Sequence, residues 1–105
     1  MNARERVLEW LAAREPAVPA LLAERLDRFA RALPEERLGD SMTTAMSALG
    51  ILALESSLTR GETGDDAALD LLTADAFVTY AFEAAAEEGL DVGPVAAHLL
   101  ERAVR

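Results

Sequence analysis

The chain has 105 residues, which fits one domain spanning residues 1–105. Its ten basic residues are all arginines and are outnumbered by 19 acidic ones, so the formal net charge is −9. Such a charge repels phosphate groups, and we expect neither nucleic acid nor a membrane surface as a partner. The absence of cysteine and lysine excludes disulfides, thiolate nucleophiles, cysteine–zinc sites and Schiff-base chemistry. The first residues lack the apolar run of a signal peptide, so the cytoplasm is the expected compartment.

The residue pattern predicts an all-α fold. No stretch alternates polar and apolar residues with a period of two, and alanine, leucine, glutamate and arginine, which favour helices, dominate. We expect a first helix over residues 3–14, capped by Asn2, and a second that starts at 17 or 20 and ends at 33. Prolines separate these helices and stop the second one. Residues 34–39 form a single helical turn or a loop.

A third helix, over residues 41–59, is apolar on almost every side, so we expect it to be buried almost all round. Serine and threonine interrupt the apolar run, which argues against a membrane span. Thr43, Gly50 and Ser57 form a strip of small residues at seven-residue spacing. Another helix backbone can approach closely along that strip.

A fourth helix, over residues 66–88, follows a glycine-containing loop and ends at Gly89, which suits a left-handed cap. A fifth is expected over residues 94–104. Because the helices over 41–59 and 66–88 are long and joined by a short loop, they should form a central antiparallel hairpin. The predicted fold is a compact bundle of four to five helices around this hairpin.

Asp75 is the most informative polar residue. It lies in the apolar stripe of Leu71, Val78 and Phe82, with Thr79 one turn further on. A carboxylate buried there has to be paired, hydrogen-bonded or protonated. Asp75 is therefore either a pocket acid that anchors a ligand, or a structural residue that caps a helical restart or binds Thr79 or an arginine.

The other charged groups have structural explanations. Glu55, the only charge between Asp40 and Arg60, either faces a cavity or pairs with an arginine, and the pairing is favoured. Three aspartates at the start of the fourth helix suit a helix N-terminus: Asp65, Asp66 and Asp70. An acidic cluster near its end is expected to be a solvated face: Glu83, Glu87, Glu88 and Asp91. His98 is the only histidine and is expected on the surface, so we predict no metal site and no cofactor.

Three classes of function remain, and a non-catalytic interaction or assembly module of the adaptor or regulatory type is favoured because no catalytic constellation is present. The second class is a small-ligand-binding bundle. Its binding residues are Asp75, Thr79, Glu55, Met46 and Phe82. The third and least favoured class is a carboxylate–metal enzyme assembled across a dimer.

The two long helices carry more apolar surface than one sheltering layer covers. Phe77 and Tyr80 lie on the opposite side of the fourth helix from Asp75. Exposed apolar patches of that size are rare in monomers. We therefore expect a homodimer through the helices over 41–59 and 66–88, and the same surface suits another protein partner.

Overall fold

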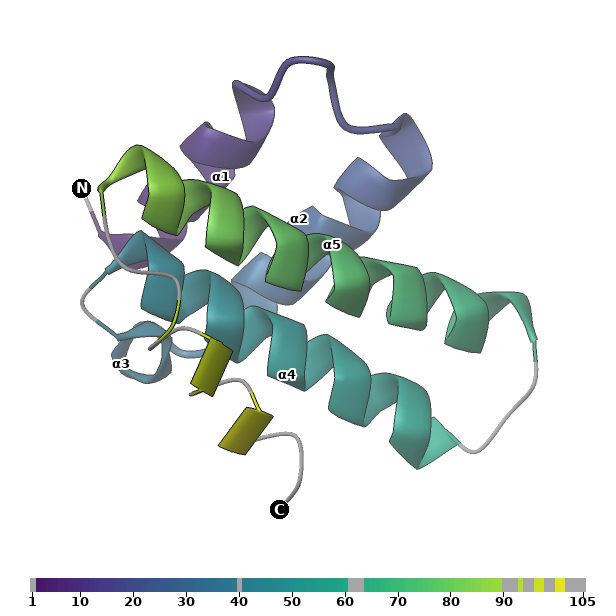
Figure 1. Cartoon of the computed structure of the whole chain (residues 1–105). Helices are drawn as coiled ribbons and strands as arrows, with labels where there is room; N and C mark the ends of the chain where they lie inside the picture. Colours follow the sequence, from purple (N-terminus) through teal and green to yellow (C-terminus); the bar gives the residue numbers. More distant parts are fainter. Residues whose placement is uncertain are drawn as a thin grey trace.

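Figure 1 shows the computed structural model, which describes residues 2–39, 41–60, 64–89, 93, 96–97 and 100–101. These residues form five α-helices and no strand, as the sequence predicts. The helices are α1 (Ala3–Ala12), α2 (Ala20–Ala32), α3 (Glu35–Leu38), α4 (Met42–Arg60) and α5 (Asp65–Glu87). The ends of α1, α2, α4 and α5 lie within about two residues of the predicted ones, and α3 is the single helical turn that was one of the two alternatives for residues 34–39. The helix expected over 94–104 lies mostly outside the described residues.

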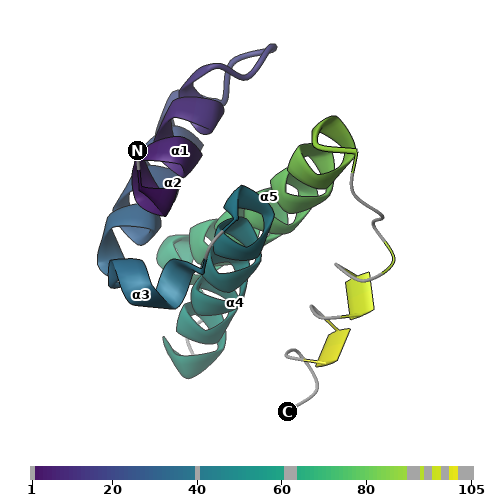
Figure 2. The ribbon, with the colours of Figure 1, turned by 90° about the vertical axis from the view of Figure 1, so that its left-hand side faces the viewer.

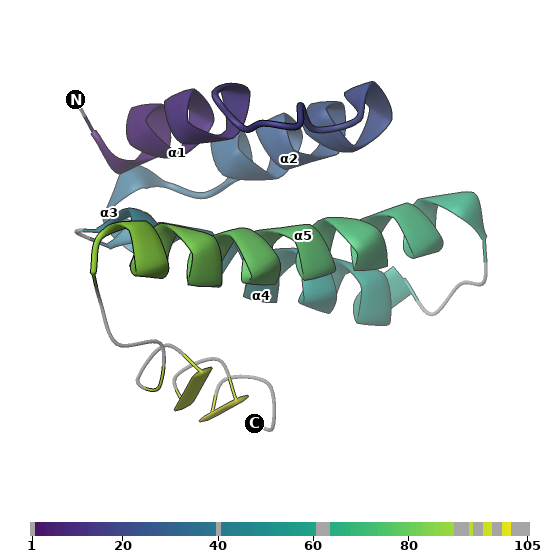
Figure 3. The ribbon, with the colours of Figure 1, turned by 45° about the horizontal axis from the view of Figure 1, so that its top comes forward.

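The helices form two layers. α1 and α2 lie together on one side of α4 and α5, and the short α3 connects the layers (Figures 2 and 3). α4 and α5 lie side by side and make the most extensive contact of any two helices. The radius of gyration of 13.0 Å is that of a compact chain of this length. Within the described residues, no helix is both long and apolar enough to cross a membrane.

The helix ends follow the predicted capping residues. The side chain of Asn2 accepts a hydrogen bond from the backbone N–H of Glu5 at 2.8 Å, which caps α1. Ser41 Oγ accepts one from the N–H of Thr44 at 3.1 Å, which caps α4. Gly89 adopts a left-handed conformation with φ of 74° just after α5. These three residues mark their helix ends through local hydrogen bonds or backbone conformation.

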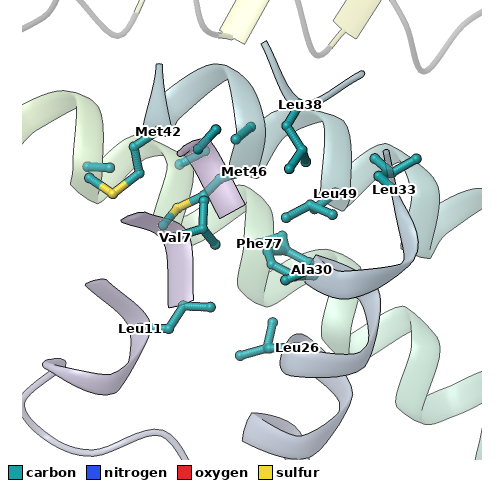
Figure 4. Close-up of a cluster of buried hydrophobic side chains, with 14 of the residues drawn as sticks. Val7, Leu11, Leu26, Ala30, Leu33, Leu38, Met42, Met46, Leu49 and Phe77 are labelled. Atoms are coloured by element: carbon teal, nitrogen blue, oxygen red, sulfur yellow. The ribbon is translucent and has the colours of Figure 1, made fainter. Parts of the chain in front are cut away.

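The hydrophobic core lies between the two layers (Figure 4). Its largest fully buried apolar side chains come from all five helices: Val7, Leu26, Leu38, Met46, Leu49 and Phe77. Burying one such side chain contributes about 1.5–3 kcal/mol. Within the α1–α2 layer, Arg4 Nε donates to the carbonyl of Ala30 at 3.1 Å and Arg4 Nη2 to that of Leu33, so this side chain satisfies the end of α2.

α4 and α5 lie close together at Gly50. A Cβ on Gly50 would lie 3.3 Å from Val78 Cγ2 and 3.4 Å from Phe77 Cβ. One turn short of the end of α4, Ser57 Oγ donates to the carbonyl of Ala67 at 3.3 Å. The close approach predicted for the strip of small residues is confirmed at these two positions.

The buried side of α5 differs from the apolar stripe that the sequence suggested. Its buried residues are Ala67, Asp70, Thr73, Ala74, Phe77, Ala81, Ala84 and Ala85. Leu71 and Leu72 are instead exposed, at 53% and 59%. Most of these buried residues are small, and Ala74, Ala81 and Ala84 belong to the core cluster, whereas Leu71 and Leu72 lie outside it. Phe77 is fully buried and Tyr80 is half-buried against α1, so α1 and α2 cover that side within one chain.

Candidate functional site

Asp75 is exposed, and it lines a groove between α4 and α5. The groove has a volume of about 510 Å³ and faces away from the core. Its lining is otherwise uncharged: Gly50, Ile51, Leu54, Leu71, Leu72, Ala74 and Val78. This hollow, the α4–α5 groove, has a mostly apolar lining. Asp75 therefore contributes an exposed carboxylate to this groove and does not lie in the protein interior.

The other residues predicted for a ligand site lie in different places. Thr79 is exposed and Phe82 is half-buried, both on α5. Met46 is fully buried in the core between the layers. Glu55 is exposed and lines a second groove of about 380 Å³ with Arg37 of α3. The five residues therefore do not line one cavity.

The buried carboxylate of α5 is Asp70 and not Asp75. Asp70 is 0% exposed, and its Oδ1 lies 2.8 Å from Nη1 of Arg25. Ser56 Oγ donates to Oδ2 of Asp70 at 3.1 Å. The sequence carried a signal for this position, because Asp70 lies seven residues before Phe77 and shares its side of the helix. The sequence pattern groups Asp70 with Asp65 and Asp66 at the helix start, which hides the burial of Asp70. Only Asp65 and Asp66 lie in the first turn of α5.

A second polar cluster joins α1 to the end of α5. The guanidinium of Arg14 lies 3.4 Å from the centre of the Trp10 ring, and its Nη1 lies 2.7 Å from Oε2 of Glu87. Trp10 Nε1 donates to the other carboxylate oxygen of Glu87 at 3.2 Å. The hydrogen bond from Arg14 holds the pKa of Glu87 below its usual value. Burial, with the nearby charge of Glu83, raises the pKa of Tyr80.

That cluster changes the interpretation of the acidic residues near the end of α5. Glu83 lies 3.8 Å from Arg14, and Glu87 binds it directly, so two of the four expected solvated carboxylates are paired. Glu88 is exposed, whereas Asp91 and His98 lie outside the described residues. Trp10 and Arg14 are four residues apart, about one helical turn, and this spacing in the sequence indicates that their side chains are neighbours.

The polar groups on the described part of the chain form no obvious reaction centre. No group of three or more histidine, aspartate or glutamate side chains there could hold a metal ion. Two buried oxygens, Glu35 Oε2 and Thr43 Oγ1, have no hydrogen-bond partner among the described residues. They lie on different helices, α3 and α4. Comparison with family models, with curated proteins and with solved structures gives no match.

Proposed function

We propose that this chain is a non-catalytic interaction or assembly module that docks through the outer side of α4 and α5. The observation that supports this is the exposure of three leucines there: Leu58 at 71%, Leu71 at 53% and Leu72 at 59%. Leu71 and Leu72 line the α4–α5 groove, and Leu58 lies one turn beyond Leu54 of its lining. Large apolar side chains gathered around a groove are typical of a docking surface.

The proposed partner is a second copy of the chain. In each copy α4 and α5 would form a central antiparallel hairpin, and the homodimer would form through these two helices. A two-fold axis places the same surface on both partners, so each leucine set would meet its own copy. Asp75 is the only charged side chain among the residues that line the groove. A strongly acidic chain repels its copies, and a groove with a single charge in its lining adds little to that repulsion.

Sedimentation velocity tests the dimer with a matched pair of variants. Leu71→Glu puts a charge at the groove, whereas Leu21→Glu puts one on α2, where Leu21 is 64% exposed outside the groove lining. We expect the parent and Leu21→Glu to sediment as dimers at micromolar concentration, and Leu71→Glu to weaken the dimer by about tenfold or more. A parent chain that sediments as a monomer at high micromolar concentration would rule out the homodimer.

A small-ligand-binding bundle is the second candidate, because the same groove combines apolar walls with one carboxylate. That chemistry suits an apolar cation whose charged group pairs with Asp75. Native mass spectrometry of the purified protein, with elemental analysis of the same sample, tests it. An organic adduct that Asp75→Asn loses and Glu88→Gln keeps would favour this candidate over the interaction module. An unliganded parent would remove its support.

A further inference from the structure

The hollow of about 380 Å³ that Arg37 and Glu55 line, the α3–α4 groove, carries two exposed side chains of opposite charge. Arg37 comes from α3 and Glu55 from α4. Neither forms an ion pair with the other or with a third residue in the described part of the chain. Both charges are therefore accessible to a molecule that enters the groove.

The α4 side of this groove contains a row of residues parallel to the helix axis. They follow one another by three or four positions: Thr44, Ala48, Ile51 and Glu55. This spacing places them on one side of the helix. From Thr44 to Glu55 the helix rises by about 16 Å, so the carboxylate lies at one end of an elongated groove.

The arginine enters the groove from the other end. Figure 1 shows α3 beside the beginning of α4. The contact is close there, since a Cβ on Gly39 would lie 2.7 Å from Thr44 Cγ2. Arg37 is two residues before Gly39, so its backbone lies near the Thr44 end of the groove. The two charges therefore come from opposite ends of the row, with Glu55 three turns of α4 beyond Thr44.

The rest of the lining is mainly apolar. Leu33 and Ile51 line the groove and are only 5% and 8% exposed. Ala48 and Leu52 also line it and are partly buried against the core. The volume of the groove lies within the range of about 300–1,000 Å³ that is typical of small-molecule pockets. A ligand that fills it therefore needs an apolar body between its charged ends.

The net charge of the chain restricts the ligand further. At −9 the chain repels anions, which disfavours a molecule that carries only a partner group for Arg37. A molecule that carries only a cation would pair with Glu55 and leave the guanidinium without a partner. A zwitterion has no net charge, and its carboxylate can accept two hydrogen bonds from Arg37 while its ammonium group binds Glu55. Because Arg37 and Glu55 do not pair with each other, the charged groups of the ligand have to be separated as well.

We propose that the α3–α4 groove binds a dipeptide with apolar side chains, with the peptide carboxylate on Arg37 and the peptide ammonium on Glu55. An extended chain of two residues spans about 7 Å, whereas the two charged groups of a free amino acid share one carbon. The apolar lining contacts the side chains of the peptide. This site is separate from the leucines and the Asp75 carboxylate of the α4–α5 groove, so it does not depend on the proposed dimer.

Titration of the full chain with leucyl-leucine, followed by NMR chemical shifts, tests the proposal together with two blocked forms of the same dipeptide. The acetylated form lacks the ammonium group, and the amidated form lacks the carboxylate. We expect the parent to bind leucyl-leucine with a Kd below about 1 mM, and Arg37→Gln and Glu55→Gln each to weaken that binding by about tenfold. Arg37→Gln should leave the affinity for the amidated form unchanged, and Glu55→Gln should leave that for the acetylated form unchanged.

Arg28→Gln and Glu88→Gln are the matched controls, because they remove the same charges from exposed positions outside the groove lining. Each should change the affinity for leucyl-leucine by less than about twofold, since solvent and salt screen distant surface charges. A parent chain that shows no binding at about 10 mM peptide would overturn the proposal. So would equal losses in Arg37→Gln and Arg28→Gln, or a loss that is the same for all three peptide forms. Loss of binding in Asp75→Asn would also overturn it, by assigning the peptide to the α4–α5 groove.

Discussion

The guanidinium of Arg25 lies 2.8 Å from the carboxylate of Asp70, whose side chain is completely buried, and so joins α2 to α5. The same guanidinium reaches Asp66 at 2.6 Å, and Ser56 of α4 donates to Asp70 at 3.1 Å. Three helices therefore meet at one carboxylate. Because an unpaired charge in this position has little access to water, the position depends on its partners.

Arg25→Leu is expected to lower the free energy of unfolding by about 3–5 kcal/mol, because it removes the charged partner that lies 2.8 Å from the buried Asp70 carboxylate. Arg28→Leu, on the same helix, is the control, since Arg28 is exposed and lies 3.7 Å from an equally exposed Glu24. That change should cost under about 0.5 kcal/mol. Urea denaturation followed by circular dichroism measures both. Equal effects of the two changes would show that the buried pair is not a main contributor to stability.

The sequence was sufficient for the helices because their signals are local. Asn2 and Gly89 mark two helix ends through their own backbone and side-chain preferences, and both act as predicted. Gly50 was also interpreted correctly, since a residue without a side chain in an apolar helix indicates a close neighbour. Each of these inferences needs only the residue and its immediate surroundings.

The sequence was not sufficient for the orientation of α5. Its apolar residues surround most of the helix, so the largest side chains do not identify the buried side. Its buried side consists mainly of alanines, and this orientation exposes Leu71 and Asp75 while burying Asp70. The partner of Asp70 is 45 residues away in the chain, a separation that periodicity does not reveal. Because α5 is oriented in this way, Asp75 lies at a surface groove and Asp70 holds the buried position.

Gly50→Val should lower the free energy of unfolding by about 1–3 kcal/mol, because the added side chain forces α5 away from α4. Even its Cβ would lie 3.3 Å from Val78 Cγ2 and 3.4 Å from Phe77 Cβ, and valine adds two further methyl groups beside these contacts. Gly64→Ala is the control, since a Cβ on Gly64 meets nothing within 4 Å. Thermal unfolding compares the variants. If Gly50→Val unfolds at the same temperature as the parent, α4 and α5 do not pack this closely.

Glu87 should give the chain a stability that depends on pH in the acid range. The hydrogen bond from Arg14 lowers its pKa in the folded state below the ordinary 4.5, so the unfolded chain binds more protons there. Its contribution is present above pH 4.5 and is lost as the pH falls through the lower folded pKa. Glu87→Gln should therefore unfold at a lower temperature than the parent at neutral pH, and the difference should shrink as the pH falls below 4.5.

Glu88→Gln is the control for that measurement, because Glu88 is the exposed neighbour of Glu87. It should follow the parent at every pH. A gap between Glu87→Gln and the parent that stays constant from neutral to acid pH would mean that the ionised carboxylate is not what stabilises the α1–α5 contact.

Thr43 and Thr73 should respond in opposite directions to the same change to valine. Both are buried, with Thr43 4% and Thr73 0% exposed. Thr73 Oγ1 donates to the carbonyl of Leu69 at 2.7 Å, whereas Thr43 Oγ1 has no hydrogen-bond partner among the described residues. A buried hydroxyl without a partner costs about 1–3 kcal/mol, so Thr43→Val should stabilise the protein by about 1 kcal/mol. Thr73→Val removes a hydrogen bond and should destabilise it by about 0.5–1.5 kcal/mol. Chemical denaturation of both variants decides the matter, and a loss of stability in Thr43→Val would mean that this hydroxyl is satisfied after all.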